Sequence, residues 1–286
     1  IMKNPMANQA YGAYKAYSPS QPSRFSQPSP NQPSMKTTTI SPAYEAAAGF
    51  IAAVPQLFAQ GKGDTLHDGR NTVRAFDTPA GRLVVKRYKR PNIVQRVAYS
   101  FFKKSKAERA YLYAAELRKR GFLTPREVAF IEIRHGLLLA DSYFVSECCP
   151  DPPAFGPLVR ADSFDTAMAD AMAEQVAEMH RKGVLHGDLN LGNFLYRPTA
   201  GGGYTFTVID TNRSHFRDGW PTRRECIDNL KTMTHRRDVF AYIVSRYAAL
   251  RGWDAAATLA DATAALERFE RRHRRKDALK HAVRRG

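Results

Sequence analysis

The chain has 286 residues, enough for one two-lobed unit with a substantial core but too few for a second large domain. Lys and Arg number 44 against 27 Asp and Glu, giving a formal charge of +17 and a pI near 10.0. This charge indicates an anionic partner: nucleic acid, nucleotide, acidic glycan or anionic membrane. Three cysteines exclude a disulfide framework and favour a reducing, cytoplasmic compartment. With no signal-peptide pattern and no run near the roughly 18 apolar residues of a membrane span, we expect a soluble or peripheral protein.

The first 36 residues differ in composition from the rest of the chain. Residues 1–36 are rich in Ser, Pro, Gln and Asn, contain no acidic residue and show no apolar period. Such a segment cannot bury enough apolar surface to fold, so we predict that it is disordered. A folded start after Met35 suggests the hypothesis that part of it is a dispensable tail or a misplaced start site, which an intact-mass measurement of the native protein would test.

Three short strands are predicted at the start of the folded part, over residues 65–67, 72–76 and 82–88. The third carries Lys86 at the end of an apolar run, a pattern typical of the strand that directs a lysine toward nucleotide phosphates in a kinase small lobe. The alternative for Lys86 is an ordinary surface lysine in a basic stretch. No Gly-x-Gly-x-x-Gly pattern is present, and the candidate phosphate cover is the first turn, formed by Gly69, Arg70 and Asn71.

A helix is predicted over residues 105–120, because apolar side chains recur there at helical spacing. Glu108 lies in its first turns, where a kinase small lobe has the glutamate that fixes the strand lysine against the phosphates. We therefore predict an ion pair between Glu108 and Lys86. The alternatives are an exposed Glu108 paired with Lys104 or Arg109, and Glu116 as a weaker candidate partner for Lys86.

A hinge is predicted after two further strands, over residues 127–133 and 137–147. Residues 148–153 contain three prolines, which suits a hinge between two lobes. We expect the adenine of a nucleotide to lie beside this stretch, near Glu147, Cys148 and Cys149. The two cysteines are interpreted as small buried apolar side chains rather than a redox or metal site.

The most informative run covers residues 186–193, where Asp188 and Asn193 lie five positions apart. A helix predicted over 162–182 precedes this run, and a hairpin with a triple-glycine turn follows it and ends in Asp210. Phosphoryl transfer requires a base aimed at the acceptor hydroxyl and ligands that hold magnesium on the phosphates. We predict Asp188 as the base and Asn193 and Asp210 as the metal ligands.

The same region departs from protein kinases in informative ways. Gly187 stands where many protein kinases have arginine, and His186 is expected to brace the loop. Asp210 is followed by Thr-Asn-Arg rather than Phe-Gly, and no Ala-Pro-Glu motif follows, so we expect no peptide-docking activation segment and a new helix near Thr222. Arg213 is expected either to contact an acidic sugar or phosphate or to form an internal ion pair that orders the loop.

Together these features predict an α+β, protein-kinase-like fold of two lobes. The small N-terminal lobe is an antiparallel β-sheet with one helix, and the larger C-terminal lobe is mainly helical. The predicted organisation is a disordered segment 1–36, an N-lobe 37–148, a C-lobe 149–266 and a basic helix or tail 267–286. ATP is expected to bind between the lobes.

A family resemblance is carried by six segments: Gly69 to Thr72, Val84 to Lys86, Lys104 to Arg109, Gly121 with Thr124 and Pro125, the 186–193 loop, and Asp210 to Arg213. These segments resemble the bacterial lipopolysaccharide core kinase family, over roughly residues 55–251. The resemblance implies an enzyme that uses ATP and Mg²⁺ to phosphorylate a Kdo or heptose sugar. Its acceptor would be the lipopolysaccharide core or a lipid A precursor, at the cytoplasmic face of the inner membrane.

The excess positive charge leaves other interpretations open. The basic run from Glu267 onward is interpreted as a solvated helix, or, with residues 86–96 and 103–106, as a surface that holds anionic lipid at about 1 kcal/mol per basic residue. A nucleic-acid or scaffold protein on an inactive kinase fold is a second hypothesis, disfavoured because all five polar core positions are present. A protein kinase or an antibiotic kinase is the third.

Overall fold

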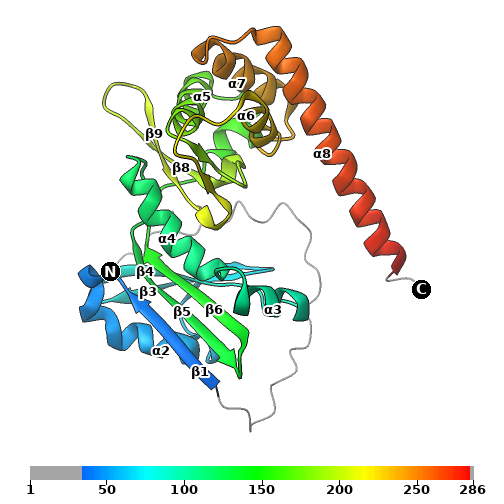
Figure 1. Cartoon of the computed structure of the whole chain (residues 1–286). Helices are drawn as coiled ribbons and strands as arrows, with labels where there is room; N and C mark the ends of the chain where they lie inside the picture. The colour runs from blue at the N-terminus through cyan, green and yellow to red at the C-terminus, as the bar shows by residue number, and fades with distance from the viewer. Residues whose placement is uncertain (1–33, 284–286) are drawn as a thin grey trace. The chain divides into compact units, whose positions relative to one another are not determined.

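The chain forms two compact units, shown in Figure 1. The first contains Ile1–Pro152 and Thr207–Asn212, and the second contains Pro153–Phe206 and Arg213–Gly286. The computed structural model describes residues 34–283, so the predicted disorder of residues 1–33 falls outside the described part of the chain. The segment that carries Asp210 thus belongs to the first unit, although it follows residues 186–193 in sequence.

The first unit is built on a six-stranded antiparallel sheet. Its strands, in the spatial order β1-β5-β6-β4-β3-β2, are β1 (Ser34–Ile40), β2 (Asp64–Asp68), β3 (Thr72–Thr78), β4 (Gly81–Arg87), β5 (Glu127–His135) and β6 (Leu138–Glu147). The prediction of disorder through residue 36 is wrong for Ser34–Lys36, which pair with β5. An edge strand is held by backbone hydrogen bonds, so it does not need the apolar alternation that these residues lack.

Helices cover both faces of this sheet. The η2 turn (Pro42–Ala47) and α2 (Ala48–Ala59) pack on one face in a core that includes Leu83 and Val85 of β4. On the other face, α4 (Lys106–Lys119) and β4 residues Val84 and Lys86 line one pocket. Successive side chains of a strand alternate between its two faces, and both faces are covered here. The sequence of β4 is therefore a continuous apolar run with one inward lysine.

The second unit is mainly helical. Its elements are η3 (Gly156–Arg160), α5 (Thr166–Arg181), β7 (Val184–Leu185), η4 (Leu191–Asn193), β8 (Phe194–Pro198), β10 (His215–Phe216), α6 (Arg223–Leu230), α7 (Arg237–Leu250) and α8 (Ala255–Val283). β8 pairs with β9 (Tyr204–Val208), and β9 and the short η5 (Thr211–Arg213) each cross from one unit to the other. The helix expected near Thr222 is confirmed, since Thr222 is the N-cap of α6.

Two predicted boundaries in the second unit are wrong. The helix expected from residue 162 begins at Thr166, because Asp165 is the N-cap and its carboxylate accepts from the Met168 amide at 2.9 Å. Phe164 therefore lies before the helix, where its ring packs on Tyr242 at 5.4 Å. The boundary at Glu267 is not a break in structure, because α8 continues through it.

The core of the second unit is formed by α5, α7 and the buried side chains of residues 186–193. Met168, Met172, Val176 and Met179 of α5 are all buried, which confirms that these methionines are core residues. His180, next to them, is fully buried, with Nδ1 2.7 Å from the Tyr247 hydroxyl and Nε2 3.0 Å from Asn229 Oδ1. Burial lowers the pKa of His180 to about 4.

Candidate active site

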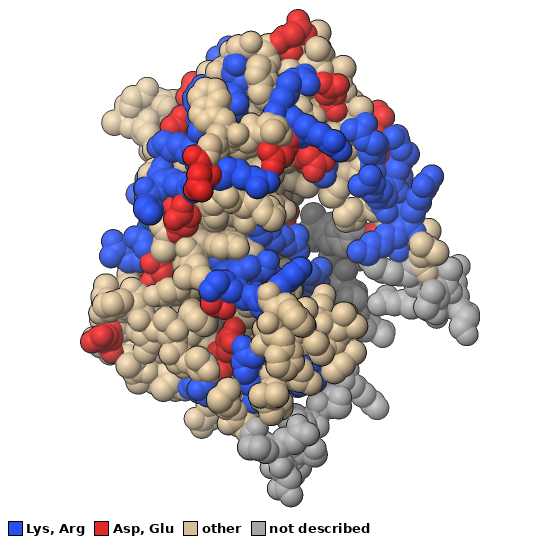
Figure 2. All heavy atoms as spheres, viewed as in Figure 1, with Lys and Arg blue, Asp and Glu red and all other residues tan. Residues whose placement is uncertain are grey.

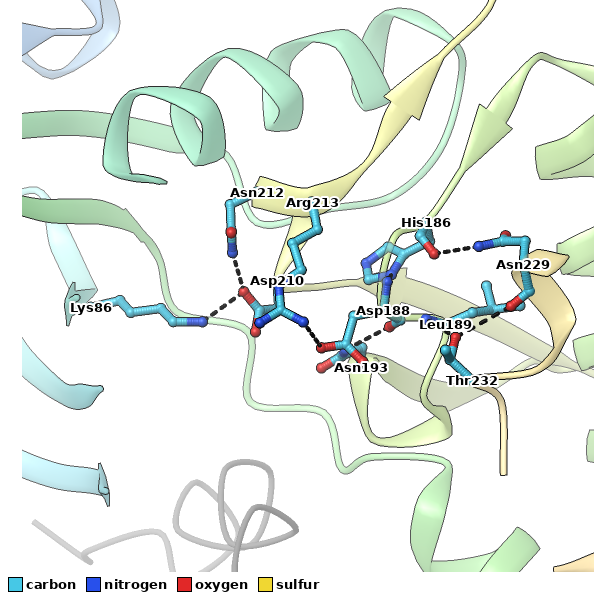
Figure 3. Close-up of polar contacts among 10 residues, drawn as sticks. All are labelled: Lys86, His186, Asp188, Leu189, Asn193, Asp210, Asn212, Arg213, Asn229 and Thr232. Atoms are coloured by element: carbon cyan, nitrogen blue, oxygen red, sulfur yellow. Dashed lines mark hydrogen bonds and ion pairs between the residues drawn. The ribbon is translucent and has the colours of Figure 1, made fainter. Parts of the chain in front are cut away.

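The catalytic loop, residues 186–193, is held in place by hydrogen bonds to its backbone (Figure 3). His186 is buried, and its Nδ1 accepts from the Asp188 amide at 3.2 Å. Asn193 Nδ2 donates to the Asp188 carbonyl at 2.9 Å. The loop is therefore closed on itself across five residues, which confirms that His186 braces it.

Two residues of the α6 region also support this loop. Asn229 Nδ2 donates to the His186 carbonyl at 2.6 Å, and the Leu189 amide donates to Thr232 Oγ1 at 3.0 Å. Sequence reasoning missed both residues, since they lie about forty positions after the loop and carry no local signal. Because Asn229 also contacts the buried His180, the loop is joined by hydrogen bonds to the core of its unit.

Gly187 is required by a close backbone approach. A Cβ at this position would lie 2.1 Å from the carbonyl oxygen of Arg213, far inside any normal contact. Arg213 in turn places its guanidinium 3.2 Å from Asp188 Oδ2, with both side chains partly exposed. Of the two interpretations of Arg213, the structure shows the ion pair that orders the loop.

In the first unit, Lys86 and Asp210 form a second polar group. Lys86 Nζ lies 2.7 Å from Asp210 Oδ1, and the two side chains are only 15% and 17% exposed. Asn212 Nδ2 donates to the same carboxylate oxygen. Lys86 is thus directed inward and is not a surface lysine, as Figure 3 shows.

Asp210 has an unusual backbone conformation, with φ +56°, and it is the only non-glycine residue in the described part of the chain with positive φ. Asp and Asn tolerate this left-handed region better than most residues, at a cost of order 1–3 kcal/mol. Strain of this kind concentrates at functional sites, where the surrounding structure maintains it.

The predicted ion pair between Glu108 and Lys86 is not formed. Lys104 Nζ lies 2.6 Å from Glu108 Oε1, which is one of the alternatives considered above. The phase of α4 explains the difference, since Ala110 and Ala114 face the pocket and, at about 100° per residue, Glu108 projects from a different side of the helix. Glu116 pairs with Arg120 at 2.7 Å, so no carboxylate of α4 contacts Lys86 in the described residues.

A mostly apolar pocket of the first unit adjoins Lys86 and Asp210. Side chains of the sheet, of α4 and of the segments around Thr124 and Asp210 line it: Val73, Val84, Lys86, Tyr88, Ala110, Ala114, Thr124, Pro125, Phe144, Ser146, Ile209, Asp210 and Thr211. An apolar pocket with a few convergent polar groups is the usual form of a nucleotide or cofactor site. Sequence reasoning did not assign Phe144 or Ser146 to this site.

The predicted phosphate cover does not line this pocket. Gly69, Arg70 and Asn71 form the turn between β2 and β3, where the Gly69 amide donates to the Asn71 carbonyl at 3.2 Å. Asn71 Oδ1 accepts from the Lys89 amide at 3.1 Å. The Gly69 amide is thus already used within the turn, and a role in covering phosphate stays a prediction.

The predicted adenine segment begins at Glu147, the last residue of β6. The amides of Glu147 and Cys148 donate to Arg126 and Arg82 carbonyls, each at 3.0 Å, and the Glu147 carboxylate accepts from Tyr44. No backbone acceptor for the Cys149 amide is found in the described residues, and binding of adenine beside this segment stays a prediction. Burial raises the pKa of both thiols, to about 11 for Cys149, as expected for unreactive cysteines.

Comparison with known proteins gives consistent results. A model of the lipopolysaccharide kinase (Kdo/WaaP) family matches residues 58–247. The 3-deoxy-D-manno-octulosonic acid kinases of Vibrio vulnificus strains YJ016 and CMCP6 are each 25% identical over 178 residues, covering 60% of this chain and 72% of theirs. The solved structure of WaaP in complex with acyl carrier protein has a TM-score of 0.54 at 18% identity, over 84% of this chain and 98% of that one. The predicted kinase-like α+β fold is confirmed.

Proposed function

This chain belongs to the lipopolysaccharide kinase (Kdo/WaaP) family, and on that premise we propose that it transfers phosphate from ATP to a hydroxyl of the sugar acid Kdo in the lipopolysaccharide inner core. The predicted family and the predicted phosphotransferase activity are confirmed, and the protein-kinase, antibiotic-kinase and nucleic-acid hypotheses are not favoured. Heptose, the other predicted acceptor, is the competing sugar in the experiment below.

The observation that carries the proposal is the closed catalytic loop that presents Asp188. In the proposed reaction its carboxylate accepts the proton of the acceptor hydroxyl as that oxygen bonds to the terminal phosphorus of ATP, while the bond from this phosphorus to the bridging oxygen breaks and ADP leaves. Arg213, 3.2 Å from Asp188, orients this carboxylate. Lys86 contributes the positive charge that positions the phosphates.

A magnesium ion suits the side chains that we assign to it. The Asp210 carboxylate and the Asn193 amide oxygen are hard oxygen donors, which Mg²⁺ prefers. The amide nitrogen of Asn193 is used by the Asp188 carbonyl, so its oxygen is the atom suited to a cation. When bound, Mg²⁺ supplies charge neutralisation on the phosphates during transfer.

A basic cleft in the second unit supports an acidic acceptor. It extends from Gly187 of the catalytic loop and β10 to α6 and α8, and its basic lining residues are His215, Arg217, Arg223, Arg224, Lys231, Arg268 and Arg272. Three of these, Arg224, Arg268 and Arg272, have no acidic partner in the described residues. Figure 2 shows Lys and Arg side chains gathered over α8. We assign this cleft to the carboxylate or phosphates of the acceptor, because a guanidinium pairs well with both.

We propose that the enzyme acts at the cytoplasmic face of the membrane that carries the acceptor. Within residues 34–283, no helix is long and apolar enough to cross a bilayer. The basic residues of α8 support attraction to anionic lipid, an interaction that weakens as ionic strength rises.

Product analysis tests the proposed function. The purified protein is incubated with γ-labelled ATP and, in separate reactions, with Kdo-terminated lipid A, heptose-terminated core, a peptide pool and an aminoglycoside. We expect label on the Kdo acceptor in a magnesium-dependent reaction, and mass spectrometry locates the phosphate. Transfer to heptose alone would correct the acceptor, and transfer to peptide alone would overturn the proposal.

Variants of the proposed residues make the assignment specific. We expect Asp188→Ala and Asp210→Asn to lower kcat at least 100-fold, because each removes a group that acts during transfer. Asp218→Ala is the matched control, since Asp218 is an exposed acid of the same unit as Asp188. Unchanged kcat in either active-site variant, with the control also unchanged, would refute the residue roles without refuting the family.

A further inference from the structure

The short helix α3 (Ile93–Phe101) exposes an apolar face. Ile93, Val97 and Phe101 recur at every fourth position with Val94 beside them, and Phe102 follows directly, so these side chains share one side of the helix. They are between 40% and 79% exposed, and no residue of α3 is buried. Figure 2, in the same view as Figure 1, shows mostly uncharged atoms over α3.

The opposite side of α3 faces the protein, and that side is polar. Arg96 Nε donates to the Leu139 carbonyl at 3.0 Å, and the Leu139 amide donates to Ser100 Oγ at 3.0 Å. The ring of Tyr99 lies 6.0 Å from the Arg109 guanidinium. A helix at the surface of a soluble protein normally turns its apolar side inward. In α3 the orientation is reversed, and the hydrogen bonds to β6 maintain it.

We infer that α3 lies in the interface of an anionic lipid bilayer, with its apolar face in the acyl region. The nine residues are far too few to span a membrane but suit a helix lying in its plane. Lys89 before the helix and Lys103 after it are exposed, and neither has an acidic partner in the described residues. Such lysines favour anionic headgroups over a neutral surface.

The size of the face argues against a second copy of the chain as its partner. A helix of nine residues is roughly 13 Å long and, with side chains, about 10 Å wide. A stable protein interface uses roughly 20–30 residues on each partner, far more than the five apolar residues of this face. A bilayer has no such minimum, because each buried apolar group contributes to partitioning separately.

Vesicle sedimentation tests this inference with the full chain. The probe is vesicles of phosphatidylethanolamine with phosphatidylglycerol, at low and at high ionic strength. We expect wild type to keep part of its binding at high ionic strength, because insertion of apolar groups is not screened. The variant Val94→Ser/Val97→Ser/Phe101→Ser should lose this salt-resistant part, with a partition coefficient lowered at least about tenfold.

Matched variants separate insertion from other causes. Met35→Ser removes an exposed apolar side chain from β1 and should bind as wild type, whereas Arg274→Ala/Arg275→Ala in α8 should lower only the salt-sensitive binding. Circular dichroism and the melting temperature should be unchanged in the α3 variant, since the replaced side chains are exposed.

A direct measurement of depth decides between a bilayer and another partner. Val94→Trp places an indole on the apolar face, and its emission should be quenched by lipids brominated in the acyl chains. Absence of this quenching, or wild-type binding by the serine variant, would overturn the inference. Concentration-dependent dimerisation that the serine variant abolishes would instead identify a second copy as the partner.

The inference rests on the proposed function in one respect only, namely that the enzyme acts at a membrane surface. Vesicle binding requires no nucleotide and no phosphate transfer. Failure of α3 to insert would therefore leave the kinase activity standing, and failure of phosphate transfer would leave the vesicle measurements interpretable.

Discussion

The catalytic loop and the Lys86–Asp210 pair both present charged groups, but they are held in different ways. The loop is fixed by hydrogen bonds to its own backbone, from Asn193, Asn229 and Thr232. Lys86 and Asp210 form an ion pair of 2.7 Å, and the Asp210 carboxylate also accepts from the Asn212 side chain. The backbone bonds of the loop do not involve the ligand, whereas Lys86 and Asp210 have to share their charges with the phosphates and the cation that we assign to them. The base is therefore preorganised, and the nucleotide groups are expected to rearrange on binding.

The largest expected effect tests the exchangeable pair. Lys86→Met should lower kcat/KM for ATP by roughly 10²–10³, because it removes a preorganised charge from the phosphates. Glu108→Gln should change it less than about fivefold, because a partly exposed pair with Lys104 contributes little. Steady-state kinetics measures both, and an equally large loss in Glu108→Gln would mean that Glu108 moves to Lys86 when nucleotide binds.

The next effect tests the rigid loop. Gly187→Ala should lower kcat about 100-fold. The added Cβ has no space beside the Arg213 carbonyl, so the loop has to shift, and a displacement of the base by about 1 Å lowers the rate by that factor. The KM for ATP should change little, because the Lys86–Asp210 pair is not touched. Gly192→Ala is the control, where a Cβ would meet a side-chain oxygen at 3.0 Å. A loss in Gly192→Ala as large as in Gly187→Ala would contradict the explanation.

A smaller effect is expected in the basic cleft. Arg268→Ala/Arg272→Ala should raise the KM for the Kdo acceptor about tenfold, the value of one charge-assisted hydrogen bond, and leave the KM for ATP unchanged. Arg271→Ala is the matched control on the same helix, since Arg271 pairs with Glu267 and does not line the cleft. Assays with an acceptor whose carboxylate has been reduced show whether the arginines recognise the carboxylate. If they do, wild type and the double variant should have similar KM values for this acceptor.

The smallest effect concerns the support beneath the loop. His180 is neutral when folded, with a pKa of about 4 against an ordinary 6.5, so the unfolded chain takes up a proton first as pH falls. Stability should therefore fall between about pH 6.5 and pH 4, by at most about 1.4 kcal/mol per pH unit from this group. Urea unfolding at a series of pH values should show a shallower slope for His180→Gln, and an unchanged slope would contradict the assignment.

Local sequence patterns were sufficient to predict the environment of a residue where that environment is formed by its neighbours in sequence. Lys86 follows an apolar strand run, and Asp188 and Asn193 share one short loop, so their environment could be inferred from spacing. The predicted ion pair of Glu108 with Lys86 was wrong because the orientation of a helix on a sheet depends on which of its side chains pack there. In α4 the small side chains of Ala110 and Ala114 take that position.

Other features have no local signal at all. Asn229 and Thr232 reach the loop only through the packing of α6. The three cleft arginines without an acidic partner in the described residues come from α6 and α8. The four-residue apolar repeat of α3 is visible in the sequence, but a repeat does not reveal which side turns inward. That choice is made by Arg96 and Ser100 through their bonds to β6.

The left-handed backbone of Asp210 has a consequence for how this position is studied. An alanine there removes the carboxylate and also places a residue with poor tolerance for this conformation, so its effect combines chemistry with a distorted chain. Asparagine removes the charge while keeping the turn. The ratio of activities between the two variants therefore measures how much transfer depends on the course of the main chain rather than on the acid itself.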